Sequence, residues 1–182
     1  VDFLEELEVP LYKIASFEAV DLELIKYVAN TGKPMIISTG MADAEEIQEA
    51  IDAARSGGCS ELAILHCVSA YPASPGDYNL RTITDMKERF GLITGLSDHT
   101  LGHGSVLESI PLGARVIEKH FTDDNSREGP DHKFALNPTT WKEMVNLSNE
   151  VFETLGDGIK RIEKNEENAF IVQRRSIVCN KN

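Results

Sequence analysis

The chain contains 182 residues, 41% of them hydrophobic, and carries a formal net charge of -12 at pH 7. This length supports one packed domain rather than two, and no apolar run approaches the ~18 residues that a membrane-spanning helix needs. The negative charge disfavours nucleic acid and anionic membrane surfaces as partners. Because the first residues lack the build of a signal peptide and the three cysteines form no CxxC pair, we expect a cytoplasmic protein.

Short apolar segments and amphipathic helical patterns alternate along the chain. The first seven residues have the pattern of the last turns of a helix. Buried strands are predicted at residues 11–16, 34–39, 61–68, 92–97 and 115–121. Helices are predicted at residues 21–30, 43–56, 80–90, 102–112 and 139–155. Asp43 suits an N-cap, and helix ends are marked by Gly32, Gly57, Gly58 and Gly156.

This alternation, repeated every ~25 to 30 residues, is typical of βα units and therefore of an α/β fold with a parallel sheet. The sequence contains neither GxGxxG nor GxxxxGK[ST], which favours a barrel over a doubly wound sheet. Five units are too few to close a TIM (β/α)8 barrel. We therefore expect residues 1–158 to be its C-terminal five βα units, with the first three absent. Residues 159–182, charged and rich in Asn, are expected to form a linker toward a further domain.

In barrel enzymes the chemistry lies at the C-terminal ends of the strands. All five predicted strands end in polar residues, within the segments Lys13–Ser16, Ser38–Met41, His66–Ser69, Ser97–Thr100 and Glu118–Phe121. Side chains alternate across a strand, so Glu118 and His120 share one face while Lys119 takes the other. Ser97 shares a face with His99 in the same way. The sequence therefore predicts that functional groups of neighbouring strands converge.

Two histidines from consecutive strand ends, His99 and His120, can converge on one divalent metal ion that keeps oxygen ligands at its other positions. The alternative is that one of them is a hydrogen-bonded core histidine. Glu118 beside the metal suits a general acid or base or a partner for a sugar hydroxyl, although an inward carboxylate can also be the structural partner of a lysine. Cys67, flanked by apolar residues, is interpreted as a small core residue.

An anion site is predicted at neighbouring strand ends, where one ammonium group and three hydroxyl groups come together. These groups belong to Lys13, Ser16, Ser38 and Ser97. Serines that follow strands can also serve turns alone. Lys13 has a second possible role, because a buried barrel lysine can form a Schiff base.

Six segments, in this order and spacing, closely resemble the sialic acid synthase family. They are Lys13-Ile14-Ala15-Ser16, Ser38-Thr39-Gly40-Met41, His66 to Pro72, Ser97-Asp98-His99-Thr100, Glu118 to Thr122, and Gly129-Pro130-Asp131-His132. The likeness runs from about Leu11 to about Ile177. Lys13 to Glu18 and Leu112 to Phe121 look most like the bacterial pseudaminic acid synthases, whereas the N-acetylneuraminate and legionaminate branches more often carry Gly where Phe17 stands.

The resemblance implies a synthase that condenses phosphoenolpyruvate with an N-acetylated amino sugar and releases phosphate. It implies a divalent metal (Mn2+, Mg2+ or Co2+) on His99 and His120, which are catalytic together with Glu118. Phosphoenolpyruvate would be bound by Lys13, Ser16, Ser38, Ser69 and Ser97, and the sugar by Tyr71, Glu118 and Asp131. Some members carry Asn where Ser69 stands, so the shorter serine would reach the carboxylate through water.

The resemblance also implies a homodimer, in which a C-terminal antifreeze-like domain reaches the partner subunit's pocket. Without that domain and the first barrel units, the isolated fragment is expected to be inactive. Two other readings remain open at this point. One is a Schiff-base pyruvate aldolase or lyase that uses Lys13, and the other is a carbohydrate-binding module without catalysis.

Overall fold

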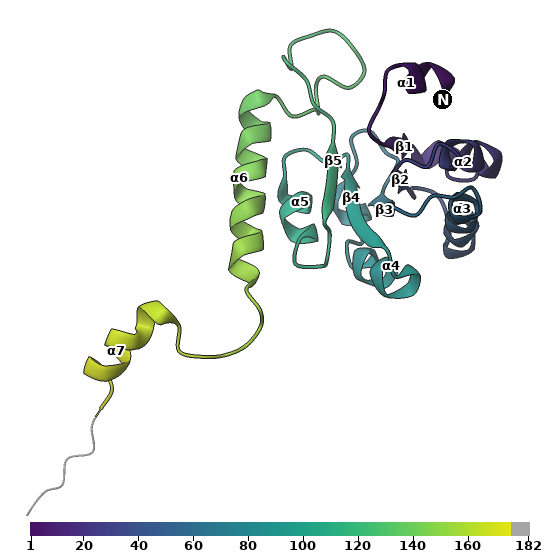
Figure 1. The fold of residues 1–182 in the computed structure, drawn as a ribbon. Helices are drawn as coiled ribbons and strands as arrows, with labels where there is room; N and C mark the ends of the chain where they lie inside the picture. Colours follow the sequence, from purple (N-terminus) through teal and green to yellow (C-terminus); the bar gives the residue numbers. More distant parts are fainter. Residues whose placement is uncertain (176–182) are drawn as a thin grey trace, which may run out of the picture.

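The computed structural model describes residues 1–175 of the chain. Five parallel strands form one sheet in the order of the sequence (Figure 1). They are β1 (Tyr12–Ile14), β2 (Met35–Ser38), β3 (Leu62–Cys67), β4 (Ile93–Asp98) and β5 (Val116–Lys119). A doubly wound sheet reverses its strand order at a switch point, and no reversal occurs here. The predicted α/β barrel class, present as five consecutive βα units, is confirmed.

The sheet is strongly curved. β1 and β5 lie at its opposite edges, yet Nζ of Lys13 in β1 lies 3.3 Å from a carboxylate oxygen of Glu118 in β5. A flat sheet of five strands would hold these edges about four strand spacings of ~4.8 Å apart. The concave face therefore brings together side chains from the first and the last strand.

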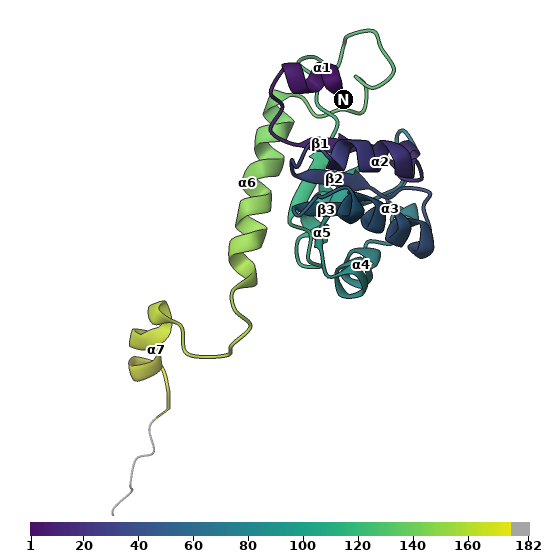
Figure 2. The same cartoon turned by 45° about the vertical axis from the view of Figure 1, so that its right-hand side comes forward.

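The helices lie on the convex side of the sheet, as expected for a barrel (Figures 1 and 2). They are α2 (Leu22–Ala29), α3 (Ala44–Ser56), α4 (Thr82–Phe90), α5 (Gly104–Ser109) and α6 (Pro138–Leu155), preceded by the short α1 (Asp2–Glu6). Their apolar sides pack on outward strand residues such as Ile37 and Ile64, each 1% exposed. Ile25 and Ile51 from α2 and α3 are buried in the same cluster.

Each predicted helix and strand is present, with differences at the ends. β1 stops at Ile14 rather than Ser16, because Ser16 begins a 3-10 turn (Ser16–Glu18) in which the Glu18 carboxylate accepts the Ala15 N–H. α5 is shorter than predicted at both ends. α6 begins at Pro138, one residue early, because the Asn137 side chain accepts the N–H groups of Thr139 and Thr140.

Beyond Gly156 the chain leaves the sheet and forms a 3-10 turn (Lys164–Glu166) and α7 (Glu167–Val172), which stand apart from the barrel units in both ribbon views (Figures 1 and 2). The predicted linker therefore contains a short helix. Its last residues, 176–182, lie outside the described residues. None of the described helices is long and apolar enough to cross a membrane.

Candidate functional site

The C-terminal ends of the strands surround a cavity of about 180 Å³. It is lined by Lys13, Ala15, Ser16, Ser38, Cys67, Tyr71, Ser97, His99, Glu118 and His120. Most of the side chains proposed from the sequence thus meet in one place. Ser69 and Asp131 do not line the cavity but lie next to it.

Strand register explains this convergence. Cys67 of β3 pairs with Ser97 of β4, which pairs with Glu118 of β5, so these three side chains form one row on the concave face. The next inward positions along β4 and β5 are those of His99 and His120. Asp98 and Lys119, between them, point to the convex face and pair with each other there. The predicted alternation of faces is what the structure shows.

Glu118 joins three strands on the concave face. The Ser97 hydroxyl donates to its Oε1 at 2.7 Å, and Lys13 Nζ lies 3.3 Å from its Oε2. Lys13 also donates to the Ile14 carbonyl at 3.1 Å. The Lys13 and Glu118 side chains are 27% and 41% exposed, so both can be reached from the cavity. The geometry therefore allows both roles proposed for Glu118, because its carboxylate pairs with a lysine and also faces the cavity.

The three serines proposed to bind an anion, Ser16, Ser38 and Ser97, are all buried. Ser16 Oγ accepts the Gly40 N–H at 3.0 Å, which leaves its own O–H free to donate. Ser38 Oγ is buried and has no hydrogen-bond partner among residues 1–175. Buried hydroxyl groups rarely lack a partner, and this one lines the cavity, so it is free to donate to a ligand there. With Lys13, these groups can surround an anion.

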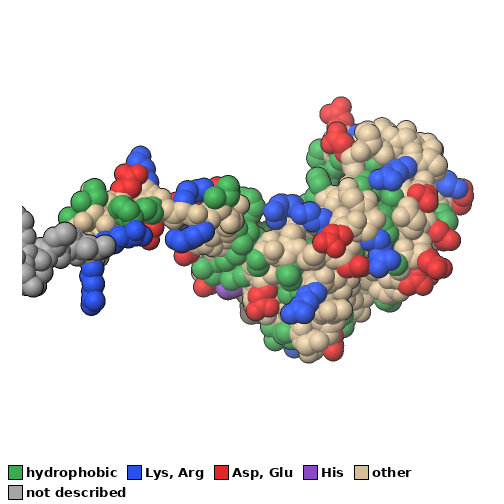
Figure 3. Space-filling view, turned by 90° about the horizontal axis from the view of Figure 1, so that it is seen from below, with side chains coloured by type: hydrophobic (Ala, Val, Ile, Leu, Met, Phe, Trp, Pro, Cys, Tyr) green, Lys and Arg blue, Asp and Glu red, His purple; other side chains and the backbone are tan. Residues whose placement is uncertain are grey.

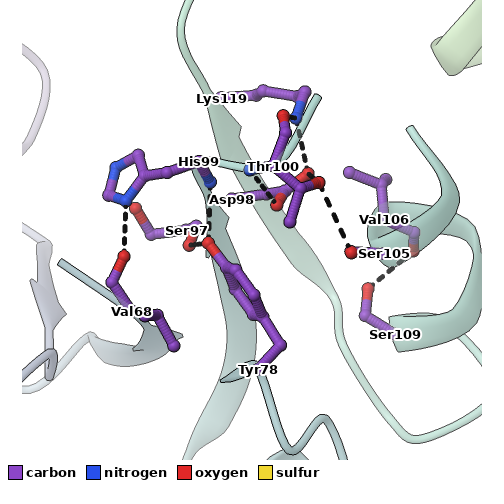
Figure 4. Close-up of polar contacts among 10 residues, drawn as sticks. All are labelled: Val68, Tyr78, Ser97, Asp98, His99, Thr100, Ser105, Val106, Ser109 and Lys119. Carbon is purple, nitrogen blue, oxygen red and sulfur yellow. Dashed lines mark hydrogen bonds and ion pairs between the residues drawn. The ribbon is translucent and has the colours of Figure 1, made fainter. Parts of the chain in front are cut away.

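His99 and His120 face each other, with ring centroids 5.2 Å apart and planes inclined at 64°. His99 Nδ1 lies 2.8 Å from the Val68 carbonyl oxygen, which assigns the proton to Nδ1 and leaves the Nε2 lone pair free (Figure 4). His120 Nδ1 lies 3.5 Å from Asp131 Oδ2, so the same tautomer is favoured there. A histidine oriented in this way through its second nitrogen is typical of a metal ligand.

The surroundings act differently on the two rings. Burial lowers the pKa of His120, which favours the neutral form that can bind a metal. Burial also works against protonation of His99, but its hydrogen bonds to Cys67 and the Val68 carbonyl outweigh this and raise its pKa. A metal ion at His99 Nε2 would compete with the proton that binds this nitrogen when the ring is charged. Among residues 1–175, no group of three or more His, Cys, Asp or Glu side chains is placed to hold a metal ion together.

Aromatic side chains form one wall of the site. The Tyr71 ring lies over His99 with centroids 4.2 Å apart and edge-on to His120 at 5.7 Å. Tyr71 is 46% exposed, so it is open to a ligand as well. The Phe134 ring packs against the His120 ring, with centroids 5.1 Å apart. Phe134 was not predicted as a site residue, because a Phe in a loop has no periodic signal in the sequence.

Cys67 differs from what the sequence indicated, whereas the position of Ser69 is compatible with the expected contact through water. Cys67 is buried, as expected of a core residue, but it lines the cavity, with Sγ 4.0 Å from His99 Nδ1. The alternation of faces along β3 would have placed it opposite Ser97. Ser69 Oγ lies 4.0 Å from Cys67 Sγ, and Ser69 is not among the residues that line the cavity. A contact of Ser69 with a ligand through water fits this position better than a direct one.

Comparisons with known proteins find relatives along most or all of the chain. A NeuB family profile matches residues 1–160. An uncharacterized protein of Methanocaldococcus jannaschii, MJ1065, is 45% identical over 100% of this chain and 54% of its own length. N,N'-diacetyllegionaminic acid synthase of Campylobacter jejuni is 39% identical over 100% of this chain and 55% of its own. Pseudaminic acid synthase of Helicobacter pylori is 42% identical, covering 89% of this chain and 48% of its own. The chain thus spans about half the length of these relatives.

Solved structures extend the comparison. The N-acetylneuraminic acid synthetase of Leptospira borgpetersenii, crystallised with citrate, superposes with a TM-score of 0.86 and 30% identity, covering 96% of this chain and 62% of that one. A DAHP synthase of Thermotoga maritima shares the fold alone, with a TM-score of 0.71 and 16% identity over 84% of this chain and 48% of that one.

Proposed function

Because the chain belongs to the NeuB family, we propose that it carries much of the active site of a synthase of sialic-type nonulosonic acids. The reaction would condense phosphoenolpyruvate with an N-acetylated amino sugar and release phosphate. One observation carries the proposal. Two facing histidines with free Nε2 atoms lie in the same cavity as an ammonium group and a buried hydroxyl group that has no partner in residues 1–175.

The residues fit a divalent metal ion such as Mn2+, Mg2+ or Co2+. His99 and His120 would hold it through Nε2, since Val68 and Asp131 occupy the Nδ1 sides. With two nitrogen ligands from the described chain, the remaining positions suit oxygen atoms of water or substrate. When bound, such an ion polarises a carbonyl oxygen as a Lewis acid.

Phosphoenolpyruvate would bind with its phosphate at Lys13, Ser16, Ser38 and Ser97. A protein with a net charge of -12 needs such a local group of donors to hold this anion. Lys13 supplies the positive charge, and the free O–H of Ser16 and the unpaired hydroxyl of Ser38 donate to phosphate oxygens. Ser69 would contact the carboxylate through water.

The amino sugar would lie against Tyr71, Glu118 and Asp131, at the open side of the cavity. C3 of phosphoenolpyruvate attacks the aldehyde carbon of the open-chain sugar and forms the new carbon–carbon bond. Water adds to the positive charge developing at C2, and phosphate leaves by C–O cleavage from the resulting tetrahedral intermediate. The residues hold the two substrates in contact, and Glu118 accepts or returns a proton at a sugar oxygen.

Within this class we propose a pseudaminic acid synthase, because the segments 13–18 and 112–121 most resemble that branch. The legionaminate and N-acetylneuraminate branches are the alternatives. Phosphate release from phosphoenolpyruvate, measured with a panel of N-acetylated hexosamines, decides among them. Phosphate release that occurs only with a mannosamine derivative would contradict the pseudaminate assignment.

The two histidines are tested by His99→Ala and His120→Ala in the full-length protein. We expect each variant to lose more than about 100-fold in turnover, with chelation of the native enzyme having the same effect. His103→Ala is the matched control, because His103 lies outside the cavity at the start of α5. Full activity of His99→Ala or of His120→Ala, or native activity that chelators leave unchanged, would contradict the metal assignment.

The alternative function, a Schiff-base aldolase or lyase that uses Lys13, has a separate test. A Schiff-base aldolase would be trapped as a pyruvate adduct on Lys13 by borohydride, without any metal. In the structure Lys13 pairs with Glu118 and donates to a carbonyl, as an ammonium group does. We therefore expect no adduct. A carbohydrate-binding module, in contrast, would bind sugar regardless of metal and phosphoenolpyruvate.

We further propose that the complete protein is a cytoplasmic homodimer, and that residues 159–182 connect the barrel units to a further domain. The further domain is supported by the relatives, of which this chain matches about half, whereas the dimer and the location rest on the family resemblance. On the same ground we propose that residues 1–182 alone are inactive. Equilibrium sedimentation of the full-length protein tests the dimer, and the turnover of the 182-residue chain tests the last point.

A further inference from the structure

We propose that the buried pair Asp98–Lys119, on the convex face of the sheet, sets the separation of His99 and His120 on the concave face. The inference rests on the proposed function, in which these histidines hold a metal ion. Asp98 immediately precedes His99, and Lys119 immediately precedes His120. The pair would thus act on the two ligands from behind the sheet, without contacting the ion.

The position of the pair in the sheet is the first argument. Asp98 and Lys119 are the last residues of β4 and β5 in register with each other. The regular backbone ladder ends there, and both histidines follow one residue later. Asp98 and Lys119 therefore form the last cross-strand tie before the two rings.

The pair is also almost completely buried, with side chains 0% and 1% exposed. Lys119 Nζ donates to Asp98 Oδ2 at 2.5 Å and to the Thr100 carbonyl at 2.7 Å. Figure 4 shows these contacts, with the His99 ring directed away from them toward Val68. A buried, charge-assisted pair keeps one geometry more strictly than an exposed pair does.

The contacts enclose His99 on both sides along the chain. Asp98 Oδ1 accepts the Thr100 N–H at 2.9 Å, and the Thr100 hydroxyl donates to Asp98 Oδ2 at 3.1 Å. His99 is thus the central residue of a small turn, and Lys119 holds the residues before and after it. Since Lys119 belongs to β5, this turn is fixed relative to His120.

Other contacts hold His99 but do not tie it to β5 in the same way. The Tyr78 hydroxyl accepts the His99 N–H at 2.7 Å and donates to the Ser97 carbonyl at 3.2 Å, which secures the end of β4 alone. The bond from Ser97 to Glu118 does join the two strands, but it lies in the cavity, where a substrate can compete for it.

A competing explanation is that the pair serves stability only. The double substitution Asp98→Leu with Lys119→Met separates the two roles, because well-packed apolar side chains often replace a buried ion pair without loss of stability. It leaves every cavity side chain in place. It removes the hydrogen bonds and the ion pair that fix the turn around His99.

The experiment titrates metal-free full-length protein with Co2+ and follows its visible absorption, which reports the ligand geometry. We expect the double variant to unfold cooperatively, to bind Co2+ about 10- to 100-fold more weakly, and to show a changed spectrum. Lys33→Met is the control. It removes an ion pair to Glu5 at the opposite end of the strands and should leave Co2+ binding unchanged.

A folded double variant that binds Co2+ with native affinity and spectrum would overturn the inference and leave the proposed function intact. Failure of the unaltered protein to bind Co2+ would overturn both. Should the double variant not fold, Asp98→Asn takes its place with the same two outcomes, because it preserves the side-chain volume and the acceptor for the Thr100 amide.

Discussion

Ser38 carries a buried hydroxyl group whose oxygen has no partner among residues 1–175. Most buried polar groups are hydrogen-bonded, and Ser38 lines the cavity, so its hydroxyl group is free to donate to a ligand. The neighbouring Ser16 has its acceptor side occupied by the Gly40 amide and its donor free. At the scale of single residues, the cavity is thus built to donate hydrogen bonds.

Ser38→Ala tests this reading. Because the hydroxyl group makes no bond within the described chain, we expect the free energy of unfolding to change by less than about 0.5 kcal/mol. The KM for phosphoenolpyruvate should rise about 10-fold or more, as for loss of a bond to a charged group. The measurements are urea denaturation and steady-state kinetics.

Ser109→Ala is the matched control for Ser38→Ala. The Ser109 hydroxyl is equally buried but donates to the Val106 carbonyl at 2.6 Å, on the convex side of the sheet. We expect it to cost about 1 kcal/mol of stability and to leave the KM unchanged. An unaltered KM in Ser38→Ala would remove Ser38 from the anion site.

Gly40 allows its neighbours to approach. A Cβ atom there would lie 2.9 Å from Ser16 Oγ and would also clash with Ser69 Oγ. We expect Gly40→Ala to displace these side chains and to lower kcat/KM for phosphoenolpyruvate by up to about 100-fold. Gly76→Ala, whose nearest contact would be Ser74 Oγ at 3.8 Å, should behave as the native enzyme. Equal kinetics of the two variants would contradict the prediction.

At the scale of elements, β4 and β5 leave no room for a side chain at Gly95. A Cβ atom there would clash with the Val116 carbonyl oxygen and lie 2.6 Å from Leu65 Cδ2. Gly95 lies on the concave face of β4, two residues before Ser97. The close contact between these two strands therefore depends on the missing side chain.

Gly95→Ala should destabilise the fold by about 1 to 3 kcal/mol, as overpacking does in other cores. Gly104→Ala at the first residue of α5, where a Cβ atom meets nothing within 4 Å, should be neutral or slightly stabilising. The midpoints of urea unfolding compare the two. A native midpoint for Gly95→Ala would show that β4 and β5 can separate freely.

Much of this element arrangement could be predicted from the sequence, because strands and helices alternate with clear periodicity and the α3 ends carry a strong N-cap, Asp43, and a Gly57-Gly58 stop. The end of β1 could not, since it depends on Glu18 capping its own turn and on a contact from the distant Gly40. In the site, alternation along strands placed His99 and Glu118 correctly. It gave no information on Phe134, whose position depends on the packing of a loop.

At the scale of the whole molecule, negative charge exceeds positive charge, and Figure 3 shows acidic and basic side chains interspersed on the face seen from below. The positive charge of Lys13 is therefore a local feature of the concave face. The choice of sugar could not be predicted with the same physical basis, because Tyr71 and Asp131 lie in loops that follow strands and are open to solvent.

The contact between Lys13 and Glu118 spans the two margins of the curved sheet, yet both side chains remain partly open to water. Ion pairs of this kind add little to stability, typically less than about 1 kcal/mol. The curvature must therefore be maintained by the backbone ladder and the helices behind it. The ammonium group is thus aimed inward before any ligand arrives, and an incoming anion can take it over from the carboxylate at small energetic cost.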